Sequence, residues 1–334
     1  MKAVIADRPY TGKIVEIKEP KVRDAYEVKV KIAYAGISNN DVRVWKGQIK
    51  VPRKSKILGH IGSGVIVEVG KMAAEDGWAV GDRVSADSLY SCGLCSNCKS
   101  GYKNACLNKQ AIPSMAEYVI WDCRMLYKIP EKVSLQEGTL FLPLCYALHV
   151  IDIAEIKLGS SALIMGASTT GLLLAQLAMK AGAERVVVVD EQRRRRCLAD
   201  SLGATHVVGY TKPNTFIHLL QISGGKGFDY VIDAMADSEA LEWGSALLAI
   251  KGTLIIFAIY EMAKHVSFEV NELLYKEASI KTALNSLNMM PRAERMLPTL
   301  KLKPLITGVF PLTEVNTAYQ EKALNKHAMV LVEF

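Results

Sequence analysis

The segment from residue 161 to residue 192, SALIMGASTTGLLLAQLAMKAGAERVVVVDEQ, limits most strongly what this chain can fold into. Two short apolar runs, SALIM and VVVVD, enclose an apolar segment that predicts a helix starting near Thr170. Apolar strands separated by a helix are typical of a parallel β–α–β unit whose strands are buried on both faces. Further strand-like runs, HVVGY, FDYVIDA and GTLIIFAIY, alternate with helical segments. The pattern predicts an α/β domain with a doubly wound parallel sheet.

The turn after the first of these strands carries glycines at a spacing that is used to bind dinucleotides. That fingerprint is G-x-G-x-x-G, followed about 20 residues later by an acidic residue. Here Gly166 and Gly171 hold the outer positions, Ser168 replaces the middle glycine, and Thr170 lies between them. Asp190 ends the second strand, where its carboxylate would reach the ribose of an adenosine. We predict a nicotinamide dinucleotide site; the alternative is an α/β domain that binds no dinucleotide.

Charged residues next to Asp190 bear on which dinucleotide is bound. The run Arg193-Arg194-Arg195-Arg196 would attract a 2′-phosphate and so favours NADP(H). The carboxylate of Asp190 would repel the same phosphate. We therefore expect NAD(H), with NADP(H) as the alternative.

Four of the seven cysteines lie in the run YSCGLCSNCKSGYKNAC, residues 90–106. Cys92, Cys95 and Cys98 follow one another at intervals of three, and Cys106 comes eight residues later. Thiolates at this spacing can converge on one tetrahedral Zn²⁺. Because four thiolates leave no open position for water or substrate, we expect one structural zinc per chain that takes no part in catalysis. The alternative is a cysteine-rich loop that binds no metal.

Composition narrows the class of protein further. A chain of 334 residues is long enough for two domains. The net charge of +7 is spread along the chain and only 7% of residues are aromatic, so we expect no nucleic-acid partner. The longest apolar runs, such as LLLAQLAM, are far shorter than the roughly 20 residues of a membrane span, and no signal-peptide core follows Met1. We expect a cytoplasmic protein whose thiols are kept reduced.

A cysteine lobe followed by this nucleotide fold resembles the zinc-containing alcohol dehydrogenase family, the medium-chain dehydrogenases and reductases, and most of all its polyol and threonine dehydrogenase branch. The resemblance extends over nearly the whole chain. AVGDRV and AEYVI flank the lobe, EGTLFLPL leads into the nucleotide domain, and PLITGVFPLTEVNTAY matches near the C-terminus. The stretch DEQRRRRCLADSLGATHVV places Arg195 on the family's helix after the acidic residue, which makes it a candidate cofactor-binding residue.

The resemblance also implies the domain organisation. Residues 1–150 would form a barrel-like, GroES-like catalytic domain rich in β-strands, with the zinc lobe at 90–106. Residues 151–284 would form a Rossmann domain, and residues 285–334 would return to the catalytic domain. Relatives dimerise through an edge strand that GTLIIFAIY resembles, so a homodimer or homotetramer is expected.

The family further implies a catalytic zinc with three protein ligands, and here the residues depart from its pattern. In the stretch that starts with the family's cysteine ligand, Ser38 replaces the ligand and Asn40 replaces a proton-relay hydroxyl. Arg43 replaces a relay histidine. The family's G-H-E motif reads Gly-His-Ile and keeps His60, whereas the third ligand position is Leu142.

One histidine cannot hold zinc, because chelation by several ligands supplies the affinity. We therefore expect no catalytic zinc. If the alignment is shifted, Cys145 with His60 and Asp41 could form an atypical metal site instead. Without zinc, Arg43 could donate a hydrogen bond to a carbonyl and His60 could act as general acid. The candidate catalytic residues are Ser38, Asn40, Asp41, Arg43 and His60.

The predicted function is an NAD(P)(H)-dependent oxidoreductase with a structural zinc and no catalytic zinc. It would transfer hydride to or from a small molecule, either a carbonyl/alcohol couple or an activated C=C bond, where charge develops on a remote oxygen. A hypothesis of another class is a catalytically inactive pseudoenzyme that still binds nucleotide and structural zinc. A third is a zinc-dependent alcohol or polyol dehydrogenase with the atypical site.

Overall fold

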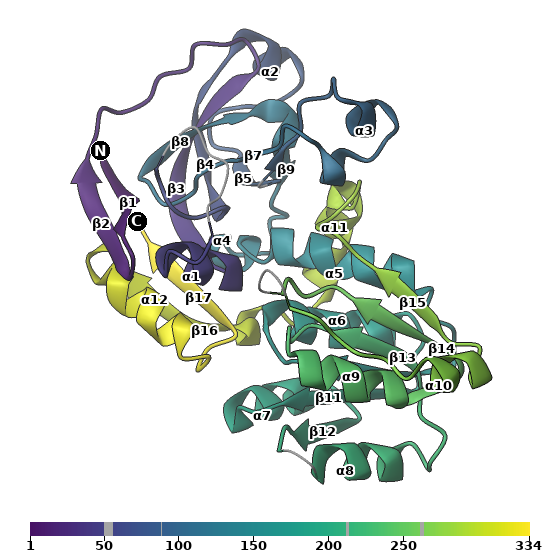
Figure 1. Cartoon of the computed structure of the whole chain (residues 1–334). Coiled ribbons are helices and arrows are strands. Elements are labelled where there is room, and N and C mark those ends of the chain that lie inside the picture. Colours follow the sequence, from purple (N-terminus) through teal and green to yellow (C-terminus); the bar gives the residue numbers. More distant parts are fainter. Residues whose placement is uncertain (50–55, 88, 212–213, 261–263) are drawn as a thin grey trace. The chain divides into compact units, whose positions relative to one another are not determined.

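The computed structural model describes residues 1–49, 56–87, 89–211, 214–260 and 264–334 (Figure 1). The chain forms two compact units. Unit 1 combines Met1–Cys145 with Leu287–Phe334, and unit 2 is Tyr146–Ser286. Both ends of the described chain therefore contribute to unit 1, while unit 2 is one continuous segment. The boundaries that the sequence predicted are 150/151 and 284/285.

Unit 1 is built on a seven-stranded sheet. Its strands are β3 (Glu27–Ile37), β4 (Ile61–Val69), β5 (Arg83–Ala86), β8 (Tyr118–Asp122), β9 (Leu126–Lys128), β16 (Ile306–Pro311) and β17 (Met329–Glu333). The order is β16-β17-β3-β4-β5-β9, with β8 also paired to β3. Neighbours run antiparallel except β16 and β17, which are parallel. β3 is the hub of the sheet, because it pairs with β17, β4 and β8.

Shorter elements complete unit 1. The α-helices are α1 (Asn39–Trp45), α2 (Lys71–Glu75), α3 (Ser96–Lys99), α4 (Leu135–Gly138), α11 (Met290–Met296) and α12 (Val315–Ala323). The 3₁₀ helices are η1 (Lys103–Ala105), η2 (Cys123–Met125), η3 (Leu297–Thr299), η4 (Lys303–Leu305) and η5 (Leu312–Glu314). Two antiparallel pairs join β1 (Lys2–Arg8) to β2 (Thr11–Glu16) and β6 (Leu89–Tyr90) to β7 (Gln110–Ala111). The β6–β7 pair closes the base of the cysteine lobe, since β6 precedes Cys92 and β7 follows Cys106.

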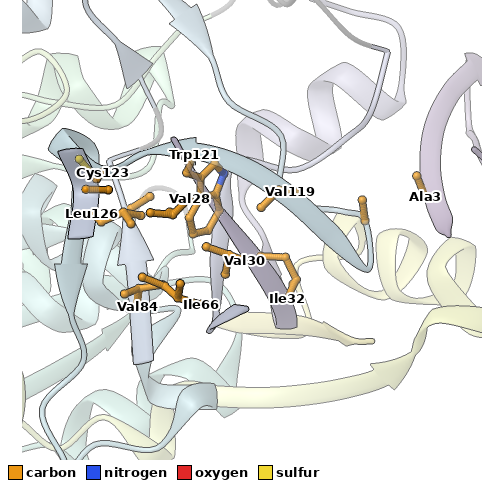
Figure 2. Close-up of a cluster of buried hydrophobic side chains, with 13 residues drawn as sticks. Ala3, Val28, Val30, Ile32, Ile66, Val84, Val119, Trp121, Cys123 and Leu126 are labelled. Atoms are coloured by element: carbon orange, nitrogen blue, oxygen red, sulfur yellow. The ribbon is translucent and has the colours of Figure 1, made fainter. Parts of the chain in front are cut away.

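The core of unit 1 follows from the two-residue period of its strands. On β3, Val28, Val30 and Ile32 are buried and alternate with more exposed lysines. Figure 2 shows these side chains gathered beside Trp121 of β8 and Ile66 of β4. This alternation is what a sheet with one face on a core requires.

Unit 2 is a six-stranded, all-parallel sheet in the order β12-β11-β10-β13-β14-β15. Its strands are β10 (Ser161–Met165), β11 (Arg185–Asp190), β12 (His206–Gly209), β13 (Phe228–Asp233), β14 (Leu248–Ile256) and β15 (Ser279–Thr282). This order confirms the predicted doubly wound sheet, with the strand order reversing between β10 and β13. The expectation for GTLIIFAIY is corrected: it belongs largely to β14, which lies between β13 and β15. The edge strand is β15, which no strand-like run had indicated.

Helices connect these strands. They are α6 (Thr169–Lys180), α7 (Arg193–Ser201), α8 (Asn214–Ile222), α9 (Ser238–Ala246) and α10 (Val270–Tyr275), and α5 (Phe141–Ala154) carries the chain from unit 1 into unit 2. α6 starts one residue before the expected Thr170. In the part of the chain that the structure describes, no helix combines the length and the hydropathy needed to cross a bilayer.

The alternation on β4 gives a matched test of the unit 1 core. Ile66 is 0% exposed and its neighbour Val67 is 37% exposed. Replacing Ile66 by alanine should lower the free energy of unfolding by about 2–5 kcal/mol, because the cavity adds to the lost apolar transfer. Val67→Ala should cost less than about 1 kcal/mol. Denaturant unfolding measures the free energy of unfolding of both variants. Equal decreases would contradict the finding that Ile66 faces the core and Val67 faces away from it.

Candidate active site and metal centre

The four cysteines of the lobe converge as the sequence predicted. Their Sγ atoms all lie within 4.8 Å of one another. Cys92 Sγ is 3.6 Å from Cys106 Sγ, and Cys95 Sγ is 4.0 Å from the same atom. A tetrahedral zinc with Zn–S bonds of about 2.3 Å separates its sulfurs by about 3.8 Å. The donor set and its spacing therefore fit one Zn²⁺.

Backbone N–H groups lie close to these sulfurs and favour the thiolate form that binds a cation. Cys95 is the N-cap residue of α3 and its N–H lies 3.4 Å from Cys92 Sγ, while the N–H of Cys92 lies 3.3 Å from Cys106 Sγ. Hydrogen bonds from the backbone N–H groups of Leu94 and Cys95 lower the pKa of Cys92 to about 6. Burial and then the neighbouring Cys95 raise the pKa of Cys98 to about 12. One thiolate is thus favoured at neutral pH, and a bound cation would favour the others.

In unit 1, Ser38 acts as a helix cap. Its Oγ accepts a hydrogen bond from Asp41 N at 3.1 Å, and Asp41 Oδ2 accepts one from Ser38 N at 2.9 Å. This reciprocal pair is the capping box that starts α1. The residue that replaces the family's cysteine ligand therefore has a structural partner of its own.

Asp41 also holds His60, which follows Leu58 and Gly59 just before β4. Asp41 Oδ1 lies 2.9 Å from His60 Nδ1, and the side chains are 1% and 14% exposed, respectively. An ionised carboxylate only accepts hydrogen bonds, so Nδ1 carries the hydrogen and Nε2 is the nitrogen that can exchange a proton. Asn40 and Arg43 lie on α1 beside Asp41, both half-buried. The structure thus brings together Ser38, Asp41 and His60.

The other two positions considered for a metal lie on α5. Leu142 is buried and has no donor atom. Cys145 is also buried, and its Sγ lies 2.9 Å from Met290 Sδ on α11. Burial raises the pKa of Cys145 well above its ordinary value, which keeps it a thiol. The side chains at positions 38, 60 and 142 do not fit a three-ligand zinc site.

The lobe differs from the rest of the described chain in how closely its metal-binding groups approach one another. Within the described ranges, the four lobe cysteines are the only group of three or more His, Cys, Asp or Glu side chains with closely spaced ligand atoms. His60, Asp41 and Cys145 do not form such a group.

In unit 2, the glycine turn has the geometry that its sequence predicted. Gly166 has a φ of +108°, which favours glycine. A Cβ on Gly171 would lie 1.9 Å from Gly166 O, so only glycine lets α6 start this close to β10. Ser168 caps α6 by accepting a hydrogen bond from Gly171 N at 3.3 Å, and Thr170 is half-buried on the first turn. The turn presents a helix N-terminus, which suits a pyrophosphate.

Asp190 ends β11 and is tied to this turn. Its Oδ2 accepts a hydrogen bond from Ala167 N at 2.8 Å, and its Oδ1 accepts one from Gln192 N at 2.8 Å. Arg195 Nη1 lies 3.7 Å from Asp190 Oδ2. Both side chains are buried, and burial lowers the pKa of Arg195 from its ordinary value. The predicted cofactor residues Gly166, Ser168, Thr170, Gly171, Asp190 and Arg195 therefore all lie on or beside one turn.

Two residues at the same edge of the sheet were not predicted from the sequence. Asp233 ends β13 and is fully buried, and Tyr260 donates a hydrogen bond to its Oδ2 at 2.8 Å. Burial raises the pKa of Asp233 from its ordinary value. The available signal was the acid at the end of FDYVID, which is the last residue of β13 as Asp190 is the last residue of β11.

Two family models match the chain. The one described as "Alcohol dehydrogenase GroES-like domain" matches residues 24–131, which lie in unit 1. The one described as "Zinc-binding dehydrogenase" matches residues 169–299, most of which lie in unit 2.

Comparisons over the whole chain also find dehydrogenases and reductases. "Probable D-xylulose reductase A" of Aspergillus clavatus is 30% identical over 335 residues, covering 94% of this chain and 91% of that protein. A protein of Sinorhizobium meliloti described as a zinc-binding dehydrogenase, solved bound to NADP, superimposes with a TM-score of 0.92 at 27% identity and covers 100% and 99% of the two chains. A zinc-binding dehydrogenase structure from Clostridium scindens gives a TM-score of 0.90 at 25% identity, with coverage of 100% and 99%.

Proposed function

Since the chain belongs to the zinc-containing alcohol dehydrogenase family, we propose that it is an NAD(P)(H)-dependent oxidoreductase with one structural zinc and no catalytic zinc. The observation that carries the proposal is the Ser38–Asp41–His60 arrangement. The residue at the first ligand position caps a helix, and the histidine at the second is held by a buried carboxylate. What remains is a group suited to proton transfer and not to metal binding.

The nicotinamide cofactor supplies the hydride, or accepts it in the reverse direction. The chain's own residues must then handle one proton. When a carbonyl is reduced, the hydride bonds to the carbonyl carbon and His60 Nε2 gives its proton to the oxygen, which yields the alcohol. Asp41 keeps the ring oriented through Nδ1 and stabilises the imidazolium from which the proton leaves. Arg43, on the same helix as Asp41, is the second candidate donor to the oxygen.

A positioned proton donor favours a carbonyl/alcohol couple as the substrate. The Aspergillus clavatus relative carries the name of a reductase of D-xylulose, so small ketoses and polyols are the first substrates to test. The substrates that the protein turns over will distinguish this proposal from its two alternatives. Reduction of activated C=C bonds alone would indicate that His60 has another role. Binding of NADH without turnover of any substrate class would indicate a pseudoenzyme.

For the dinucleotide we propose NAD(H), because the Asp190 carboxylate lies at the end of β11, where a ribose 2′-hydroxyl is recognised. NADP(H) is the alternative, supported by the exposed Arg193 and Arg194 on the first turn of α7. We also propose a cytoplasmic location. It is supported by the seven cysteines, all within the described residues, of which none forms a disulfide.

Zinc content tests the proposed metal composition most directly. Protein purified without chelator should contain one zinc per chain, as measured by inductively coupled plasma mass spectrometry. Cys98→Ser should contain none, because three thiolates leave the closed site incomplete. The exposed Cys197, outside the lobe, provides the control, and Cys197→Ser should keep its zinc. Two zinc ions per wild-type chain would show that a catalytic zinc is bound after all.

The role of His60 is tested by His60→Asn in the NADH-dependent reduction of small ketoses. Loss of a general acid should lower kcat by roughly 10²–10⁴-fold. The Kd for NADH should be unchanged, because the substitution leaves every predicted cofactor-binding residue in place. His206→Asn, at an exposed histidine of unit 2, is the matched control and should keep its kcat. A wild-type kcat in His60→Asn would contradict the proposal that His60 is the general acid.

We further propose that copies of unit 2 associate through β15 into a homodimer or homotetramer. β15 is an edge strand, and large exposed apolar side chains lie on and near it, namely Ile250, Val270, Leu274, Tyr275, Ile280 and Leu284. Light scattering should give the mass of two or four chains, and Ile280→Asp should reduce it. Leu158→Asp, at an exposed leucine elsewhere in unit 2, should not. A wild-type monomer would contradict the proposal.

A further inference from the structure

The carboxyl edge of the unit 2 sheet contains a second turn next to the glycine turn. β10 ends at Met165 and β13 ends at Asp233, and these two residues are register partners in neighbouring strands. The strand order of the sheet reverses between them. Ligands of doubly wound proteins bind at the carboxyl ends of the strands at such a reversal. Residues 166–171 and residues 234–237, which follow the two strands, therefore flank the place where a dinucleotide would bind.

The two turns are in direct contact. Ala234 N donates a hydrogen bond to Met165 O at 2.9 Å. A Cβ on Gly166 would lie 2.9 Å from Ala234 O and 3.2 Å from Met235 N, which leaves no room for a side chain there. Any movement of residues 234–236 would therefore be transmitted to the glycine turn.

Asp233 determines the shape of the second turn. Its Oδ1 accepts hydrogen bonds from Met235 N at 3.0 Å and from Ala236 N at 3.1 Å. Ala236 has a φ of +62°, a left-handed conformation that an alanine adopts only at a cost. The two hydrogen bonds offset this cost, so the turn depends on where the Asp233 carboxylate points.

Tyr260 fixes the other oxygen of that carboxylate. Its hydroxyl donates to Asp233 Oδ2 at 2.8 Å and lies 3.4 Å from Asp237 O, at the far end of the same turn. Asp233 is fully buried, and a buried carboxylate is stable only when its oxygens are hydrogen-bonded. Tyr260 follows β14, so the pair joins that segment to the end of β13.

We propose that Tyr260, acting through Asp233, is a positioning residue for the nicotinamide cofactor. The inference rests on the cofactor binding proposed above. Without the hydroxyl, the carboxylate reorients to recover a hydrogen-bond partner and releases the N–H groups of Met235 and Ala236. Residues 234–236 then shift, and the glycine turn that receives the pyrophosphate loses its support. Tyr260 need not touch the cofactor to affect its binding.

Tyr260→Phe tests this inference, with Tyr230→Phe as its matched control. The Tyr230 hydroxyl also donates a hydrogen bond, to Glu155 O at 2.9 Å, but Tyr230 lies nearer the amino end of β13. The Kd for NADH, from quenching of its fluorescence, should rise roughly tenfold in Tyr260→Phe, as expected for a lost bond to a charged group. It should stay within about twofold of wild type in Tyr230→Phe, although both variants lower Tm.

Two further measurements separate positioning from general stability. In Tyr260→Phe the KM for the dinucleotide should rise while kcat and the KM for the carbonyl substrate change little. Amide hydrogen exchange at Met235 and Ala236 should speed up, and exchange in α9 should not. A wild-type Kd for NADH in Tyr260→Phe, or an equal rise of that Kd in Tyr230→Phe, would overturn this inference and leave the proposed function standing. Failure of the wild-type protein to bind NADH or NADPH would overturn the proposed function and this inference with it.

Discussion

A buried carboxylate must have its oxygens hydrogen-bonded, and this requirement shapes every candidate catalytic or cofactor site in the chain. Asp41, Asp190 and Asp233 are all buried, and each accepts a hydrogen bond from a backbone N–H group within three residues of itself. Each uses its other oxygen to reach a group farther away: His60, Ala167 and Tyr260, respectively. Because desolvating a carboxylate is expensive, these contacts fix the local backbone strongly. Three aspartates thus connect local turns to distant parts of their own unit.

The two metal positions of the family differ in how much of the chain they need. The lobe cysteines lie within 15 consecutive residues, and the β6–β7 pair closes the segment locally. A catalytic zinc would instead need donors at positions 38, 60 and 142, brought together by the fold of unit 1. Substitutions at two of these positions, 38 and 142, can remove the metal while the capping box and the Asp41–His60 contact remain. Loss of the catalytic zinc would therefore leave the lobe and the sheet intact.

What the sequence could predict depended on how local each feature is. The strands of unit 2 were visible as short apolar runs, and the zinc lobe, the glycine turn and Asp190 followed from spacing alone. The edge of the sheet was misplaced because strand order depends on pairing between distant segments, and β15, with the sequence SIKT, has no apolar run. Asp233 and Tyr260 were missed for the same reason, since 27 residues separate them. The contact of Cys145 with Met290 joins residues 145 positions apart, and no sequence pattern indicates it.

The pairing of β3 with β17 has a consequence for how the chain acquires its structure during synthesis. β3 is made early, yet its partner along residues 34–37 is β17, which includes residues 330–333. Unit 2 is a single continuous segment and can collapse as soon as residue 286 has left the ribosome. The unit 1 sheet must wait, with residues 34–37 of β3 unpaired on one side, until almost 300 further residues have been added. During that interval an apolar, hydrogen-bonding strand edge is open to misassociation, and at this stage the nascent chain has most need of a chaperone.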